Sequence, residues 1–138
     1  MKKLALSLLM MLFVVAAYAQ QQKAAAVNGP QITFEETEFN FGDIKQGEKV
    51  EHIFAFKNTG TAPLVLSNVL TTCGCTASEW PKEPVAPGKT AQIKVTFNSA
   101  GKMGVQNKVV TIVSNAVNAQ EQVKMVGNIV PATAAAGR

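Results

Sequence analysis

The amino-acid sequence predicts an all-β protein, a single seven-stranded immunoglobulin-like β-sandwich that follows a cleaved signal peptide. Three observations predict this fold class. Short runs of residues alternate between apolar and polar side chains, clusters of turn residues separate the runs, and no window shows helical periodicity. Alternation of this kind suits a sheet that packs one face against a second sheet and exposes the other to water.

The N-terminal 19 residues have the parts of a secretory signal peptide. Lys2 and Lys3 form a positive start, residues 4–17 are almost all apolar, and Ala17-Tyr18-Ala19 is a small-residue cleavage site. The apolar run is shorter than the roughly 20 residues that span a bilayer. We therefore expect an exported protein, periplasmic or extracellular, with no transmembrane segment after cleavage at residues 1–19.

The rest of the sequence divides into a polar spacer at residues 20–30, a folded domain at residues 31–130 and an Ala-rich tail at residues 131–138. Turn residues such as Asn58-Thr59-Gly60 separate the strand-like runs of the domain. The segment from Thr71 to Lys89 contains three prolines and is predicted to be irregular. The seven predicted strands are Gln31–Phe34, Glu38–Gly42, Lys49–Asn58, Pro63–Leu70, Thr90–Phe97, Val105–Val113 and Gln122–Val130.

Three of these runs alternate clearly enough to assign a face to each side chain. Every second residue is apolar, apart from one histidine and one glycine, so these residues are expected to point into the sandwich. The predicted inward residues are Val50, His52, Phe54 and Phe56, then Ala91, Ile93, Val95 and Phe97, and finally Val123, Met125, Gly127 and Ile129.

Charge and motif content exclude several classes of function. The chain has 13 Lys+Arg against 9 Asp+Glu, two of the basic residues lie in the predicted signal peptide, and the remaining lysines are scattered singly. The basic cluster of a nucleic-acid-binding face is missing. No carboxylate pair, Ser/His/Asp set or glycine-rich phosphate loop stands out, so we expect neither an enzyme nor a bound cofactor.

Several motifs occur in a recognisable order. They are F-x-F-G at Phe39–Gly42, H-x-F-x-F-x-N-x-G at His52–Gly60, P-L-V-L at Pro63–Leu66, C-G-C-T at Cys73–Thr76, P-x-x-P-x-x-P-G-K at Pro81–Lys89 and I-x-V-x-F at Ile93–Phe97. The sequence resembles a bacterial family of exported proteins known as domain of unknown function 1573, over roughly residues 34–130. That family is similar in fold to the immunoglobulin-like major-sperm-protein and Hydin-type domains. The resemblance implies the sandwich fold and brings no activity with it.

Cys73 and Cys75, separated only by Gly74, are the only cysteines of the chain. A disulfide between them would enclose one residue and add almost no entropic stability. Alternate residues of a strand lie roughly 6.6 Å apart, at the limit of what a disulfide tolerates. Four interpretations therefore remain open: a labile pair without catalytic role, which can pack as reduced thiols, a redox-active pair, a metal-binding pair, and a thioester-like or lipid attachment. Export favours oxidation, but no adjacent cation or thioredoxin-like pattern activates a thiolate.

A metal site would need a further ligand, and His52 is the only histidine. Two soft sulfurs suit Cu(I) or Zn(II), and the expected topology brings His52 and the C-G-C motif to the same pole of the sandwich. A histidine between Val50 and Phe54 is also typical of a packed side chain with satisfied nitrogens. Trp80 is either an exposed contact for a partner or a cap on the open end of the core.

We therefore predict a non-enzymatic exported binding or structural module of the cell envelope, whose partner is another envelope or extracellular protein. The alternative is a small redox-active or metal-handling protein that uses Cys73 and Cys75, with His52 as a helper.

Overall fold

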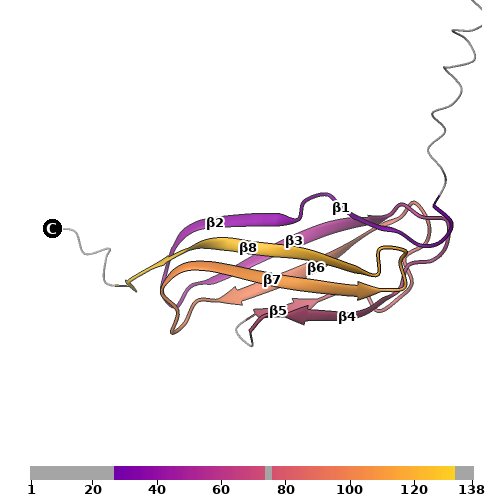
Figure 1. Ribbon diagram of the computed structural model, residues 1–138. Coiled ribbons are helices and arrows are strands. Elements are labelled where there is room, and N and C mark those ends of the chain that lie inside the picture. The colour runs from indigo at the N-terminus through magenta and orange to yellow at the C-terminus, as the bar shows by residue number, and fades with distance from the viewer. Residues whose placement is uncertain (1–26, 74–75, 133–138) are drawn as a thin grey trace, which may run out of the picture.

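The computed structural model describes residues 27–73 and 76–132 of the chain (Figure 1). The predicted signal peptide, most of the predicted spacer, residues 133–138 of the predicted tail, Gly74 and Cys75 lie outside the described residues. Within the described ranges, no helix has the length and apolar character needed to cross a membrane.

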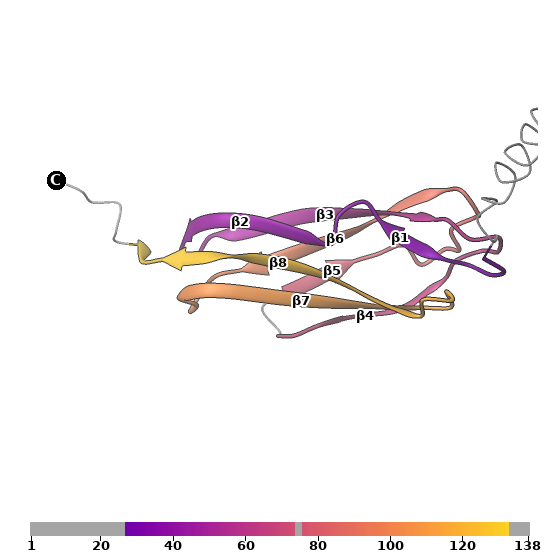
Figure 2. The ribbon, with the colours of Figure 1, turned by 45° about the horizontal axis from the view of Figure 1, so that its top comes forward.

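In the described part of the chain, eight strands form two four-stranded sheets that pack face to face, which confirms the all-β sandwich. The first sheet has the order β1-β3-β6-β5 and the second the order β2-β8-β7-β4. Strands β7 and β8 cross in front of β3 and β6 in Figure 1, and Figure 2 shows β7 and β8 side by side. The strands are β1 (Ile32–Phe34), β2 (Glu38–Lys45), β3 (Lys49–Asn58), β4 (Leu66–Thr71), β5 (Thr76–Glu79), β6 (Thr90–Asn98), β7 (Gly104–Ser114) and β8 (Gln120–Val130).

The prediction of seven strands was wrong, because the segment expected to be irregular contains a short eighth strand, β5. Its sequence, TASE, has no large apolar residue to reveal it. The strand forms at the edge of the first sheet by pairing antiparallel with β6, from Thr76 opposite Phe97 to Glu79 opposite Lys94. Pairing with β6 rather than hydrophobic alternation therefore defines this strand.

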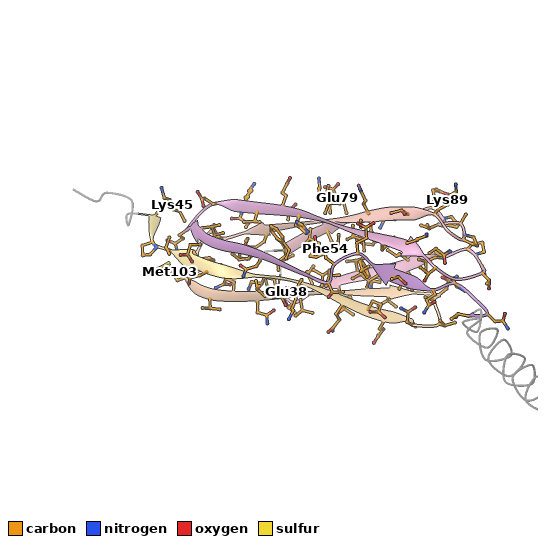
Figure 3. All side chains as sticks on the ribbon, turned by 90° about the horizontal axis from the view of Figure 1, so that it is seen from above. Glu38, Lys45, Phe54, Glu79, Lys89 and Met103 are labelled. Carbon is orange, nitrogen blue, oxygen red and sulfur yellow. The ribbon has the colours of Figure 1, made fainter. Side chains whose placement is uncertain are left out.

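The inward faces predicted from alternation are confirmed. Phe54, Phe56 and Phe97 are completely buried, and Val123 and Met125 of β8 meet them from the second sheet. Pairing of β3 with β6 keeps the inward positions of both strands on the same side, from Val50 opposite Phe97 to Phe56 opposite Ala91. The core therefore lies between the two sheets along their length, with Phe54 near its centre (Figure 3).

The chain changes sheets between β1 and β2. Strand β1 pairs antiparallel with β3 in the first sheet, whereas β2 pairs in parallel with β8 in the second. The ring of Phe41 in β2 packs directly over Gly127 of β8, where an added Cβ would lie 2.2 Å from the ring. Gly127 therefore leaves the space that Phe41 occupies in the sandwich.

Asn58, at the end of β3, joins three segments at the pole that also carries Lys89 (Figure 3). Its fully buried side chain donates to the carbonyl oxygens of Ala62 and Val85, both at 2.8 Å, and accepts from the amides of Gly60 and Gln31 at 3.0 and 3.3 Å. The N-x-G motif and the proline-rich segment thus meet at one buried amide and have a structural role.

Candidate functional site: a groove beside Trp80

A groove of about 350 Å³ lies on the outer face of the first sheet, next to its β5 edge. We call it the Trp80 groove. Glu79 lies about midway between the ends of the sandwich marked by Lys45 and Lys89 (Figure 3). The groove is lined by Ile53, Glu79, Trp80, Gln92 and Lys94.

Strand register positions the lining residues. Ile53 of β3 lies opposite Lys94 of β6, which in turn lies opposite Glu79 of β5. Residues that are directly opposite in antiparallel strands point to the same face, so these three side chains form one row across the outer surface. Gln92, two residues before Lys94, is on the same face. Trp80 follows β5 directly and closes the groove at the edge.

Trp80 lies between the hydrophobic core and the outer surface of the first sheet. Its half-buried side chain packs against the hydrophobic core and also lines the groove. The Lys82 ammonium lies 3.1 Å from the centre of the Trp80 ring, which is the geometry of a cation–π contact. The structure therefore supports the packing role, while contact with a partner stays a prediction.

The charges in the groove neutralise each other. Lys94 Nζ lies 2.9 Å from Glu79 Oε1. The pKa of Lys94 is raised from its ordinary value of 10.5, chiefly because of the hydrogen bond to Glu79, then because of the Coulomb attraction of Glu79 and, more weakly, of Glu51. Beside this pair, Ile53 exposes 49% of its surface. The groove therefore offers an apolar surface with a neutralised polar border.

Cys73 lies at a corner where the chain passes from the second sheet to the first. Its carbonyl oxygen accepts hydrogen bonds from the Thr76 amide and from Thr71 Oγ1, both at 3.2 Å, and its Sγ lies 3.9 Å from Thr76 Oγ1. Cys73 is disulfide-bonded. The only other cysteine of the sequence is Cys75, which lies outside the described residues. The redox and metal hypotheses for this pair remain predictions.

His52 packs within the sandwich on the side of β2. Its ring stacks on Phe39 with centroids 3.8 Å apart, meets Phe54 edge-on at 4.7 Å, and its Nε2 forms a hydrogen bond with Glu36 Oε1. These contacts match a packed histidine with a satisfied nitrogen, and β6 lies between His52 in β3 and the β5 side of the sheet, where Cys73 is found. Among the described residues, which leave out Cys75, no group of three or more His, Cys, Asp and Glu side chains could hold a metal ion.

The sequence identified Trp80 but not the groove around it. Ile53, Gln92 and Lys94 alternate with the predicted inward residues of their strands and so fall on outward faces, but nothing in the sequence placed Glu79 beside them. The missing information was the pairing of β5 with β6. To place Glu79 opposite Lys94 from the sequence, one would have to assume that Thr76–Glu79 is a strand and that it pairs with the strand that contains Lys94.

Solved structures share the immunoglobulin-like fold at low sequence identity. A protein of unknown function from Porphyromonas gingivalis W83 aligns with a TM-score of 0.64 and 16% identity, over 79% of this chain and 51% of that one. The secreted serine protease VesC from Vibrio cholerae gives a TM-score of 0.57 and 14% identity, over 72% of this chain and 23% of that one. The PapD-like domain 7 of human CEP192 gives a TM-score of 0.61 and 10% identity, over 75% of this chain and 88% of that one.

These likenesses concern the fold alone, and the chain spans about half of the Porphyromonas protein and about a quarter of VesC. No curated protein matches the sequence. The family model described as Protein of unknown function (DUF1573) matches residues 32–129, from the start of β1 almost to the end of β8. The chain therefore belongs to the DUF1573 family of proteins of unknown function.

Proposed function

We propose that this protein is an exported, non-enzymatic binding module of the cell envelope that holds another envelope or extracellular protein through the Trp80 groove. The observation that carries the proposal is the meeting of Trp80 with a half-exposed Ile53 in one surface groove. Single apolar side chains on a surface are ordinary, whereas a tryptophan beside an aliphatic side chain in a groove is typical of an interface anchor.

The chemistry of the groove favours a partner that contributes an apolar side chain. Glu79 and Lys94 already neutralise each other, and Lys82 lies over the Trp80 ring. An apolar side chain seated between Trp80 and Ile53 would remove both from water without leaving a charge unpaired. A central anchor of this kind contributes about 2 kcal/mol or more to binding. Export is supported by the predicted signal peptide in residues 1–19.

Photo-crosslinking in cells that produce the protein tests this proposal. A photoreactive amino acid in place of Gln92 is expected to form an adduct with another exported protein. The adduct should disappear with Trp80→Ala and with Ile53→Lys, and it should persist with Val117→Ala, a control at an apolar residue that is 55% exposed outside the groove. Ile53→Lys changes only the outer face of β3 and leaves the core intact. An adduct that survives both groove substitutions, or no adduct at Gln92, would contradict the proposal.

A second candidate function is redox activity of the C-G-C motif, favoured by the disulfide state of Cys73 at the corner between the edge strands β4 and β5. A pair that encloses one residue is expected to be easily reduced, because strained disulfides have more oxidising potentials. Thiol counting by mass spectrometry in glutathione buffers, with and without Cu(I) or Zn(II), measures this. A pair that stays oxidised in reducing buffer and binds neither metal would exclude both the redox and the metal role.

A further inference from the structure

Side chains protect three of the four sheet edges in the described part of the chain. The edge strands are β1 and β5 in the first sheet and β2 and β4 in the second. An edge strand presents a row of N–H and C=O groups that can pair with another chain, and proteins commonly protect such rows. One backbone amide each of β1, β2 and β4 donates to a side chain. These hydrogen bonds run from Ile32 to Asn118 Oδ1 at 3.2 Å, from Lys45 to Glu48 Oε2 at 2.8 Å and from Val69 to Asn68 Oδ1 at 2.9 Å.

Strand β5 has an unprotected edge at Ser78. The Thr76 amide donates to the Cys73 carbonyl oxygen at 3.2 Å, and the Thr76 carbonyl oxygen accepts from Thr71 Oγ1 at 3.3 Å. The backbone groups of Thr76 therefore face away from β6. Because this direction alternates along an antiparallel strand, the backbone groups of Ser78 also face away from β6. Within residues 27–73 and 76–132, neither the N–H nor the C=O of Ser78 has a hydrogen-bond partner.

This open edge adjoins the Trp80 groove. Trp80 lies two residues after Ser78, and it packs on the core from the same face of the strand as the buried Thr76. The alternation thus continues to Trp80, whose backbone groups face the edge as well. Glu79, between Ser78 and Trp80, lines the groove. Pro81 follows and has no N–H, so the ladder with β6 ends at this point. A chain that pairs with this edge therefore runs along the rim of the groove.

We propose that the partner of the Trp80 groove binds as an extended segment that adds a strand to the β5 edge, a proposal that rests on the binding function of the groove. The backbone of the segment pairs with the N–H and C=O groups of Ser78 and Trp80. The residue between these two pairings lies opposite Glu79, with its side chain on the outer face. An apolar side chain at this position lies at the rim of the groove and leaves the ion pair of Glu79 and Lys94 intact.

The unpaired backbone groups favour a strand over a helix as the form of the partner. A helix bonds its own backbone groups, so it would cover the N–H and C=O of Ser78 without bonding to them, which is unfavourable. Strand β5 has only 4 residues, so the pairing is short and supplies few hydrogen bonds. The apolar side chain at the groove supplies the rest of the affinity, and the partner therefore requires both the edge and Trp80.

Ser78→Pro, combined with the photoreactive amino acid at Gln92, tests the proposal. The substitution removes the edge N–H and leaves the groove residues in place, and proline is tolerated where the N–H of a strand faces away from its sheet. The yield of the adduct should fall about tenfold or more, because a backbone hydrogen bond to the partner is lost. Ser78→Ala is the matched control, because it removes only the hydroxyl group, and it should leave the yield unchanged.

Amide hydrogen exchange of the chain without a substitution at Ser78 provides a second measurement, which does not depend on the folding of the proline variant. The Ser78 amide should exchange faster than the Glu79 amide in the free chain and should become protected in the purified adduct. A Ser78 amide that exchanges equally fast in both overturns strand addition.

The crosslinking result separates strand addition from the binding function of the groove. An adduct that Trp80→Ala abolishes and Ser78→Pro leaves unchanged overturns strand addition alone. The absence of any adduct at Gln92 overturns both, and an adduct between two copies of this chain overturns the assignment of the added strand to another protein.

Discussion

Asn58→Ala is expected to be among the most destabilising substitutions of a buried residue in the sandwich. The side chain is completely buried and makes four hydrogen bonds, to Gln31, Gly60, Ala62 and Val85. Each hydrogen bond contributes about 1 kcal/mol net to stability, and the backbone groups that lose Asn58 as their partner stay partly buried. The free energy of unfolding should therefore fall by about 2–4 kcal/mol. For a domain of this size, that loss corresponds to a decrease in Tm of roughly 10–25 °C.

Asn98→Ala is the matched control. Asn58 and Asn98 each end a strand, and each Oδ1 accepts the amide two residues later, from Gly60 at 3.0 Å and from Ala100 at 3.0 Å. The hydrogen bond from the Ala100 amide to Asn98 Oδ1 is exposed, and it is the only hydrogen bond of the Asn98 side chain within the described residues. Its loss should lower the free energy of unfolding by about 1 kcal/mol or less. Urea and thermal unfolding followed by circular dichroism measure both. Equal losses in the two variants would refute the role assigned to Asn58.

Three further predictions concern single contacts. Gly127→Ala brings a Cβ within 2.2 Å of the Phe41 ring and should lower the free energy of unfolding in urea by about 1–3 kcal/mol. Part of this loss should be recovered when Phe41→Leu is added. Fully additive losses in the double variant would contradict the contact. Reduction of the Cys73 disulfide should lower the unfolding free energy by about 1 kcal/mol or less, because the loop is so short; a large decrease in Tm on reduction would contradict this. The pKa of Lys94 is raised by Glu79, so the stabilising effect of the pair is complete below the ordinary lysine value of 10.5 and is lost as the pH rises through the raised value. Glu79→Gln should return the Lys94 titration, followed by NMR of its side-chain nitrogen, toward that ordinary value, and an unchanged titration would contradict the pairing.

Alternation predicted the long strands and their inward faces because burial of one face imposes a period of two. Residues such as Phe54 and Val95 needed no tertiary information to be placed in the core. Strand β5 was missed because its stability comes from pairing at an edge, which leaves no periodic apolar signal in four residues. The sheet change between β1 and β2 was equally invisible, since each strand alternates in the same way whichever sheet it joins.

In the candidate site, too, local sequence patterns predict single residues, whereas strand pairing determines how they meet. Trp80 could be singled out from its residue type, and Ile53 and Lys94 from their outward positions. Their meeting in one groove depends on the register of three strands that are distant in sequence. His52 was correctly considered as a packed residue, but its partners Phe39 and Glu36 come from the segment that changes sheets, which local patterns do not position.

The fluorescence of Trp80, the only tryptophan of the chain, tests the proposed function most directly. The partner captured by the crosslinker at Gln92, chosen or substituted so that it contains no tryptophan, is titrated into the purified chain while the emission spectrum is recorded. Burial of the ring should shift the emission to shorter wavelength and protect it from iodide, and Ile53→Lys should abolish both effects. A partner that binds with undiminished affinity while the Trp80 emission and its accessibility to iodide stay unchanged would contradict a binding function for the groove.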